Sequence, residues 1–366
     1  MTVDTATVEQ IGVQAYTIGT DAPEGDGTLQ WDSTTIVVVE AHGAGRVGLG
    51  YTYADISTAK LVESKLAGVV KGQAVASPRA SWAAMVKATR NLGRPGITSM
   101  AIAAVDLALW DLHARLLDAP LCTVLGMAHD HVPVYGSGGF TTYTNDRLGE
   151  QLAGWAEQGI PRVKMKIGAH PHQDCERVRA ARDAIGPDVE LFVDANGAYE
   201  RKQALQFAGA FREEASVSWF EEPVSSDDLE GLRLLRDRAP AGMAIAAGEY
   251  GYDAGYFQRM LDDGAVDVLQ ADVTRCAGIT ELLRIGGLCR AHNLSLSCHC
   301  GPTIHVHPAC AIDELIHLEY FHDHVRIEEM LFDGLPELRE GALWPDLSRP
   351  GNGLSMRRSD AVQYSV

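Results

Sequence analysis

Acidic residues end three successive runs of β-forming residues in the middle of the chain: Asp194 after Val193, Glu221 after Phe220 and Glu249 after Gly248. One such acid alone would often only cap the helix that follows it. Three of them, from consecutive strands, form a hard, oxygen-only set that leaves positions for water and substrate. Such a set suits Mg²⁺ better than zinc, which prefers histidine or cysteine. These three acids therefore predict a magnesium site.

Two lysines precede these acids in the segment Lys164-Met165-Lys166. Side chains alternate across a strand, so both ammonium groups point to the same side. A divalent cation and a lysine beside one carboxylate would offset the charge that develops when the neighbouring proton is removed. Crowding by Lys164 and the metal should lower the pKa of Lys166, which could then act as a base near neutral pH.

A histidine and two further acids follow at later strand ends. Asp272 and His299 come from adjacent strands, and a carboxylate that orients an imidazole is the usual arrangement for a histidine general base. Glu319 ends the last strand. The chemistry that these residue types predict is removal of a proton next to a substrate carboxylate.

The elements that carry these residues alternate between β-rich runs and helix-length amphipathic segments such as 177–185 and 279–292. The predicted strands are 132–137, 162–167, 189–194, 217–221, 243–249, 266–271, 294–299 and 315–319. Alternating β and α segments indicate parallel strands, and eight of them predict a (β/α)8-type barrel with an irregular last crossover. In such a barrel the C-terminal strand ends form the mouth. A doubly wound open sheet is the alternative, but no GxGxxG follows the first strand.

The residues before the barrel predict a separate α+β domain. Strands are expected at 13–18 and 34–40, with a polar loop at 19–30 and turns at the glycines that follow: Gly43, Gly45, Gly48 and Gly50. Helices are expected at 57–70, 77–90 and 99–117, the last with Ser99 as N-cap. We expect a capping domain at 1–126, the barrel at 127–324, and a turn-rich segment at 325–366 that packs back on the cap.

Charge and composition exclude several classes of partner. The net charge of -18 argues against binding to nucleic acid or an anionic membrane. No apolar run appears long enough to span a bilayer, and residues 1–12 do not read as a signal peptide. Seven cysteines without framework spacing favour reduced thiols in the cytoplasm. An even-numbered homo-oligomer is the expected assembly.

The strand-end motifs resemble the mandelate racemase subgroup of the enolase superfamily. They are Lys-x-Lys at 164–166, Val-Asp-Ala-Asn at 193–196, Glu-Glu-Pro at 221–223, Gly-Glu at 248–249, and the single residues Asp272 and His299. The likeness covers essentially the whole chain. It implies a (β/α)7β barrel under an α+β capping domain, which agrees with the irregular last crossover.

The resemblance also implies roles. The three strand-end acids would bind Mg²⁺, while Lys166 and the His299–Asp272 pair would be acid/base groups on opposite faces of the substrate. Lys164 would neutralise the substrate carboxylate, and Glu319 would hydrogen-bond an oxygen of the enolate. Many enzymes that the chain resembles dehydrate sugar acids to 2-keto-3-deoxy acids, so we expect dehydration of a small sugar-acid substrate. Racemisation or epimerisation by the same chemistry is the alternative, and a catalytically silent ligand-binding relative is a third.

The polar loop favours a polyhydroxylated substrate over an aromatic one if it folds over the site, since it carries several groups that hydrogen-bond: Asp21, Glu24, Asp26 and Gln30.

Other histidines and cysteines are interpreted as structural. His305 and His307 match the HxH of metal-dependent barrel hydrolases, but they follow the seventh strand, in the start of a helix, instead of lying on the first. His322 and His324 could line the mouth or lie at the surface, and we favour the surface. Cys298 and Cys300 flank His299 without a CxxC partner, so we interpret them as small residues of a buried strand and not as zinc ligands.

Overall fold

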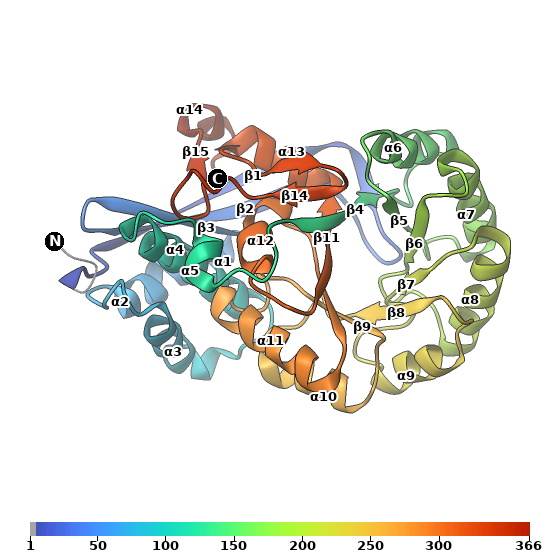
Figure 1. Ribbon diagram of the computed structural model, residues 1–366, viewed down its shortest axis with the longest axis horizontal. Helices are drawn as coiled ribbons and strands as arrows, with labels where there is room; N and C mark the ends of the chain where they lie inside the picture. The colour runs from blue at the N-terminus through green and yellow to red at the C-terminus, as the bar shows by residue number, and fades with distance from the viewer. Residues whose placement is uncertain (1–4) are drawn as a thin grey trace.

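The computed structural model describes residues 5–366. Residues 1–4 lie outside the described part of the chain, and they belong to the segment 1–12 in which no signal peptide is expected. Two bodies lie side by side (Figure 1), an N-terminal cap and a barrel. The cap sheet has the order β1-β2-β3 and is antiparallel throughout (β1 Gln10–Gly25, β2 Gln30–Gly43, β3 Arg46–Tyr53). Helical segments follow it: α1 Ser57–Leu61, η2 Val62–Leu66, α2 Ala67–Val70, α3 Pro78–Ala88, η3 Arg90–Leu92, α4 Ile97–Leu116 and α5 Leu121–Leu125.

The barrel strands are parallel and close on themselves, because β11 pairs with β4. In chain order they are β4 Val132–Gly138, β5 Arg162–Lys166, β6 Glu190–Asp194, β7 Trp219–Glu221, β8 Ala244–Ala247, β9 Val268–Ala271, β10 Ser295–Cys298 and β11 Leu315–Phe321. The connecting helices are α6 Asn145–Glu157, α7 Pro171–Ile185, α8 Arg201–Ala215, α9 Leu229–Arg238, α10 Ala254–Asp262, α11 Ile279–His292 and α12 Pro302–Ala309. The last crossover, α12, has 8 residues and contains Pro308. The predicted (β/α)7β barrel with an α+β cap is confirmed.

The C-terminal residues pack on both bodies. They form α13 His322–Leu331, β12 Phe332–Asp333, β13 Glu337–Arg339, β14 Ala342–Trp344, β15 Ser355–Met356, α14 Arg358–Ala361 and η4 Val362–Tyr364. Strand β14 pairs antiparallel with β4 of the barrel. Asn352 donates from its side-chain amide to the Leu49 carbonyl and from its backbone to Asp111, both in the cap. The segment thus ties the cap to the barrel, and the expected boundary at 324 falls inside α13.

Helix α4 packs closely against β3, and this contact corrects the predicted turns. Gly45 lies in the turn before β3, but Gly48 and Gly50 lie within the strand. A Cβ at Gly48 would come within 2.2 Å of the Ala108 carbonyl oxygen, and one at Gly50 within 2.4 Å of that of Ala104. These two glycines therefore permit the close approach of strand and helix.

Helix α4 also corrects two expectations about its own sequence. It begins at Ile97, and the Ser99 hydroxyl donates to the Arg94 and Tyr252 carbonyls instead of capping the helix. We expected no segment long and apolar enough to span a bilayer, but this helix meets both criteria. Its most apolar stretch is 78% buried in the protein, however, as expected for a core helix.

The predicted polar loop is mostly a β-hairpin. Strand β1 continues to Gly25 after an irregularity in register, β2 begins at Gln30, and the Asp26 amide closes the turn on the Leu29 carbonyl. We call residues 21–31 the lid hairpin. A Cβ at Gly27 would lie 2.2 Å from the Ala195 carbonyl oxygen, just beyond β6, so the tip rests directly on the barrel mouth.

A layer of apolar side chains, three of them aromatic, fills the barrel below the mouth. It consists of Tyr135, Phe192, Trp219, Ala246 and Val268, from five different strands. Trp219 is two residues before Glu221 and donates its indole N–H to that carboxylate at 3.0 Å. The layer therefore supports Glu221 from below.

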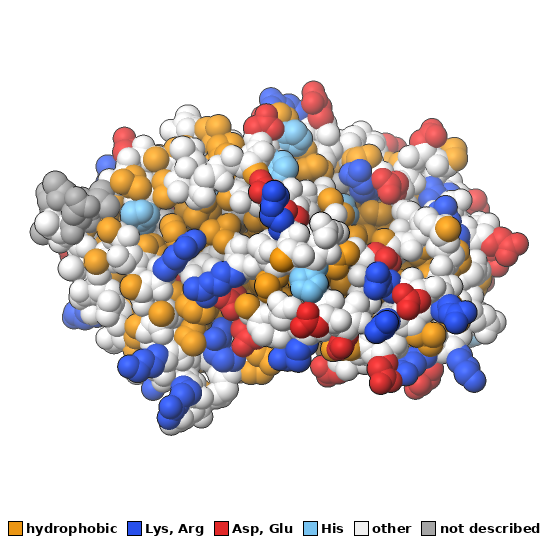
Figure 2. All heavy atoms as spheres, turned by 60° about the horizontal axis from the view of Figure 1, so that its bottom comes forward, with side chains coloured by type: hydrophobic (Ala, Val, Ile, Leu, Met, Phe, Trp, Pro, Cys, Tyr) orange, Lys and Arg blue, Asp and Glu red, His pale blue; other side chains and the backbone are white. Residues whose placement is uncertain are grey.

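Charged side chains are dispersed over the face of the molecule that Figure 2 shows. Figure 2 shows lysine and arginine side chains scattered among acidic and hydrophobic ones over one face of the molecule. All seven cysteines are free thiols, in agreement with the expectation for them.

Candidate active site

Strand register brings the first two predicted acids together. Lys166 pairs with Asp194 between β5 and β6, and Asp194 pairs with Glu221 between β6 and β7, so all three side chains lie at one level of the mouth. Glu249 follows β8. One carboxylate oxygen from each of the three acids lies within 4.8 Å of the others, and all three residues are buried.

These acids fit a hard divalent cation. Burial and the neighbouring Asp194 raise the pKa of Glu221 to about 8. The Oε2 atom of Glu249 is buried and makes no hydrogen bond within the described residues. Crowded, buried carboxylates with a free oxygen atom are the donor set that Mg²⁺ takes in proteins.

The two lysines differ in exposure to the mouth. Lys166 lies on the wall of the cavity described below, and its ammonium donates to Asp194 at 2.5 Å and to Asn196 at 3.2 Å. Lys164 is fully buried, with its Nζ 2.6 Å from Glu221 and 2.8 Å from Glu319. Its predicted contact with the substrate carboxylate stays a prediction.

The lowering of the Lys166 pKa expected beside Lys164 and a bound cation stays a prediction, and the protein's own groups act on this pKa in both directions. Burial does lower the pKa, and so does Lys164, but the Asp194 carboxylate opposes both and leaves the pKa of Lys166 above its ordinary value. The expectation took account of Lys164 and a bound cation, whereas the direct contact with Asp194 depends on the pairing of β5 with β6.

His299 and Asp272 form the predicted pair. The His299 Nδ1 lies 2.9 Å from the Asp272 Oδ2. The other Asp272 oxygen accepts hydrogen bonds from the amide and hydroxyl of Thr274, which hold the carboxylate in place. Burial lowers the pKa of His299, but the nearby Glu249 and Glu319 carboxylates raise it more, and the net shift is upward.

Glu319 joins the same cluster. Its Oε1 accepts from the Ser137 hydroxyl at 2.5 Å, and its Oε2 accepts from the Cys300 amide at 3.2 Å and lies 3.6 Å from the His299 Nε2. All eight residues predicted for the site therefore meet at one end of the barrel.

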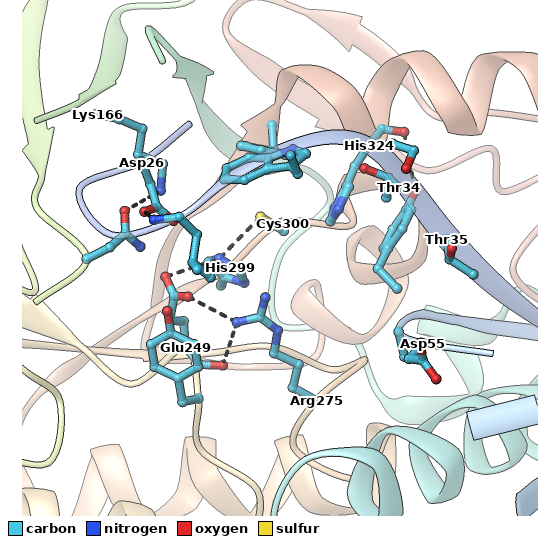
Figure 3. Close-up of a pocket in the computed structure, with 18 residues that line it drawn as sticks. Asp26, Thr34, Thr35, Asp55, Lys166, Glu249, Arg275, His299, Cys300 and His324 are labelled. Atoms are coloured by element: carbon cyan, nitrogen blue, oxygen red, sulfur yellow. Dashed lines mark hydrogen bonds and ion pairs between the residues drawn. The ribbon is translucent and has the colours of Figure 1, made fainter. Parts of the chain in front are cut away.

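A cavity of about 430 Å³ lies between the barrel mouth and the cap. Figure 3 shows Lys166, Glu249 and His299 on one side of it and Thr34, Thr35 and Asp55 of the cap on the other. The lid hairpin adds three residues to the wall, namely Asp26, Leu29 and Trp31.

The lid hairpin partly departs from the expected polar lining. Of the four polar residues named in the sequence, Asp26 lines the cavity. Glu24 is buried and accepts from the Trp31 indole at 2.8 Å, while Asp21 lies 3.2 Å from His322. The lining is thus mixed, because Leu29 and Trp31 contribute apolar surface.

Three further residues of the wall were missed or misread in the sequence. Arg275 lies 3.0 Å from Glu249, and a basic residue three positions after Asp272 was the signal for it. His324 is buried, stacks on Tyr53 with ring centroids 3.4 Å apart and lines the cavity, so its predicted surface position is wrong. Cys300 lies beyond the end of β10 and also lines the cavity, which corrects its interpretation as a strand residue.

The HxH histidines do not reach the cavity wall. Both lie in α12: His305 accepts from the Val273 amide through Nε2, and His307 accepts from the Cys122 amide through Nδ1. Their lone pairs are occupied by the backbone, as the structural interpretation predicts.

Two known domain families match the chain. Residues 25–126 match the mandelate racemase / muconate lactonizing enzyme N-terminal domain, and residues 147–361 match the enolase C-terminal domain-like family. Among solved structures, a mandelate racemase/muconate lactonizing enzyme-like protein from Rubrobacter xylanophilus has a TM-score of 0.97 and 60% identity, over 98% of this chain and 100% of that one.

Relatives of known activity are more distant. L-talarate/galactarate dehydratase of Salmonella typhimurium LT2 is 33% identical over 69% of this chain, and the chain spans only 63% of that protein in the match. Its structure with Mg and L-lyxarohydroxamate has a TM-score of 0.90 and 26% identity, over 99% of this chain and 93% of that one. D-galactarolactone cycloisomerase of Agrobacterium fabrum is 30% identical over 76% of this chain and 74% of that protein.

Proposed function

The chain belongs to the mandelate racemase / muconate lactonizing enzyme family of the enolase superfamily, and on that premise we propose that it dehydrates a sugar acid to a 2-keto-3-deoxy acid. It is an enzyme whose cofactor is Mg²⁺. The proposal extends to the roles of individual residues and to the class of substrate.

The observation that carries the proposal is the presence of two acid/base groups across the mouth from each other. Lys166 ends β5 and His299 follows β10. Around the closed barrel, two strands (β4 and β11) lie between β5 and β10 in one direction, and four strands (β6 to β9) lie between them in the other. Both residues line the cavity, and the three acids lie between them along the longer path. A substrate held there would present one face to each group.

The proposed reaction has two proton transfers. One group removes the proton from the carbon next to the carboxylate, and the C–H electron pair passes into the carbon–oxygen system of the carboxylate. The second group then donates a proton to the β-hydroxyl, the C–O bond breaks, and water leaves. The resulting enol then tautomerises: it loses the proton of its 2-hydroxyl and takes up a proton at the former β-carbon, which gives the 2-keto acid. When bound, Mg²⁺ supplies positive charge next to the carboxylate oxygens.

The pair His299–Asp272 is suited to either step. Because Asp272 accepts from Nδ1, the Nε2 lone pair of His299 faces the cavity side and can take or return a proton. Asn196 and Asp194 hold the Lys166 ammonium at the opposite side.

The cavity lining supports a hydroxylated carbon chain as substrate. It offers side-chain oxygens from Asp26, Ser33 and Asp55 and the guanidinium of Arg275, next to apolar surface from Trp31. The names of the relatives support the same class, because the dehydratase and the cycloisomerase both act on sugar-acid compounds.

The test is to incubate the protein and Mg²⁺ with a library of mono- and diacid sugars in D₂O, following 2-keto acid formation and deuterium at the α-carbon. Keto acid from one or a few members, lost in Lys166→Ala or His299→Asn and retained in the surface control Lys60→Ala, would support dehydration. Deuterium exchange without keto acid would replace it by racemisation or epimerisation, which the same pair of groups permits. Absence of both across the library would refute the proposal.

A further inference from the structure

A second group of potential metal ligands lies beside the three acids, and two of its members, His299 and Cys300, line the same cavity. The His299 Nε2, the Cys300 Sγ and the Glu319 Oε2 lie within 4.8 Å of one another, and all three residues are buried. We propose that this group, here named the thiol site, binds a thiophilic divalent cation of the Zn²⁺ class, and that the bound ion blocks His299.

The distances within the thiol site are close to those around a bound ion. The Cys300 Sγ lies 3.2 Å from the His299 Nε2 and 3.4 Å from the Glu319 Oε2, and the latter two atoms are 3.6 Å apart. Tetrahedral zinc, with its usual bond lengths to sulfur, nitrogen and oxygen, needs ligand atoms roughly 3.3–3.6 Å apart. The three side chains would need to move by only a few tenths of an ångström.

The outer partners of His299 and Glu319 engage the atoms opposite the thiol, and of the two facing atoms only the Glu319 Oε2 accepts a backbone hydrogen bond, from the Cys300 amide. The His299 Nδ1 is engaged by Asp272, so the other ring nitrogen carries the lone pair; a carboxylate behind the imidazole is the usual support of a zinc-bound histidine. The Oε1 of Glu319 is held by Ser137 and Lys164, which leaves Oε2 facing the thiol.

The backbone places Cys300, and not Cys298, in this site. Cys298 ends β10 and packs into the barrel wall, whereas Cys300 and Gly301 both have a left-handed backbone conformation, with φ of 50° and 47°. A non-glycine residue in this conformation is uncommon. Here the turn brings the thiol next to the imidazole that precedes it in the chain.

The chemistry of the thiol site separates it from the Mg²⁺ site. Burial and Glu319 raise the pKa of the Cys300 thiol, which therefore keeps its proton until a cation displaces it. Zn²⁺ binds thiolate and imidazole strongly, whereas Mg²⁺ takes oxygen ligands. Because His299 and Cys300 line the cavity, a fourth position would face the space open to water or substrate.

Other charges face the thiol site from neighbouring strands. The Glu249 Oε2 lies 3.4 Å from the His299 Nε2 and favours a cation there. Arg275 opposes one, but it is paired with Glu249 and Asp272. A cation on Nε2 would occupy the lone pair that takes the substrate proton; this consequence for activity rests on the proposed function, whereas binding itself does not.

Cobalt(II) is the probe for a direct test, because a thiolate ligand gives it a charge-transfer absorption band that oxygen ligands do not. The intact protein, saturated with Mg²⁺ so that the three acids are occupied, is titrated with Co²⁺. We expect the band to grow until one equivalent is bound and to disappear when Zn²⁺ is added. Loss of a group that only supports a metal ligand typically weakens metal binding by about 10–100-fold. His299→Asn removes a ligand itself, so it should weaken Co²⁺ binding by at least this factor.

The matched variants are Cys300→Ala, Cys300→Ser and Cys298→Ala, each checked for folding by circular dichroism. The band should be absent from both Cys300 variants and retained in Cys298→Ala. A missing band in the unaltered protein, a band that persists in Cys300→Ala, or a band lost from folded Cys298→Ala would overturn the proposal. The readout needs no substrate, so its failure is distinct from failure of the proposed dehydration.

Discussion

Lys164→Met removes a buried cation that lies among three acids. The Lys164 Nζ is 2.6 Å from Glu221, 2.8 Å from Glu319 and 3.4 Å from Asp194, and the side chain is fully buried. Removing one partner of a buried ion pair typically costs about 3–5 kcal/mol, because the remaining charge is left uncompensated. Without Mg²⁺ we expect a loss of stability of this size.

The corresponding shift in melting temperature follows from chain length. An unfolding entropy of about 2.1 cal/mol/K per residue gives about 0.8 kcal/mol/K for 366 residues. The midpoint of thermal denaturation in EDTA should therefore fall by roughly 4–6 °C. Mg²⁺ would compensate Asp194 and Glu221 directly, so it should raise the midpoint of the variant more than that of the unaltered protein.

The assay is thermal denaturation followed by circular dichroism, with EDTA and with Mg²⁺. Lys60→Met is the control, since Lys60 is exposed and pairs with Glu63 at 3.0 Å on the surface. An exposed pair contributes about 0–1 kcal/mol, so the control should shift the midpoint by about 1 °C at most. A penalty for Lys164→Met that is absent in EDTA, or the same in both conditions, would refute the reasoning.

Three further predictions concern the acid/base pair, acid stability and the cap. His299→Asn should slow exchange of an α-proton that faces the histidine by about 10²–10⁴-fold, and Lys166→Ala should do so for the opposite configuration; equal losses on both enantiomers in D₂O would contradict the assignment. Burial lowers the pKa of His307 to about 4 from the ordinary 6.5, so the unfolded chain takes up the proton first and stability falls as the pH drops between these values. His307→Asn should lack this loss of about 3 kcal/mol in urea titrations at pH 7 and pH 4, and parallel behaviour of both proteins would count against it. Gly50→Ala places a Cβ 2.4 Å from a carbonyl oxygen of α4 and should destabilise the fold by about 1–3 kcal/mol or more. Gly68→Ala is the control, because a Cβ there meets nothing within 4 Å. Equal stability of the two variants would show that α4 moves away from β3 at no cost in free energy.

The barrel and its strand-end residues could be predicted because both depend on local patterns. Each strand is a short run of β-forming residues between amphipathic helices, and parallel order places all C-terminal ends at one mouth. Lys166, Asp194 and Glu221 are then neighbours by register alone. The predicted strand-end residues could therefore be placed together at the mouth without knowledge of long-range packing.

The interpretations of Cys300 and His324 were wrong because the positions of these two residues depend on tertiary contacts and not on local patterns. Cys300 looked like the continuation of a buried strand, and a left-handed turn instead directs its thiol toward His299. His324 follows the last strand in a polar stretch, and its burial depends on stacking against Tyr53 of the cap. Neither contact leaves a trace in residue spacing.

The sequence by itself therefore determined the fold, the order of the strand-end groups and the class of cation, since these follow from side-chain periodicity and ligand chemistry. Only the tertiary structure decided what closes the cavity, that His324 lines it and which thiol reaches the imidazole. These depend on contacts between segments far apart in the chain, such as the lid hairpin with its tip at Gly27 resting on the end of β6. Such contacts are set by the packing of the cap on the barrel, which no local pattern encodes.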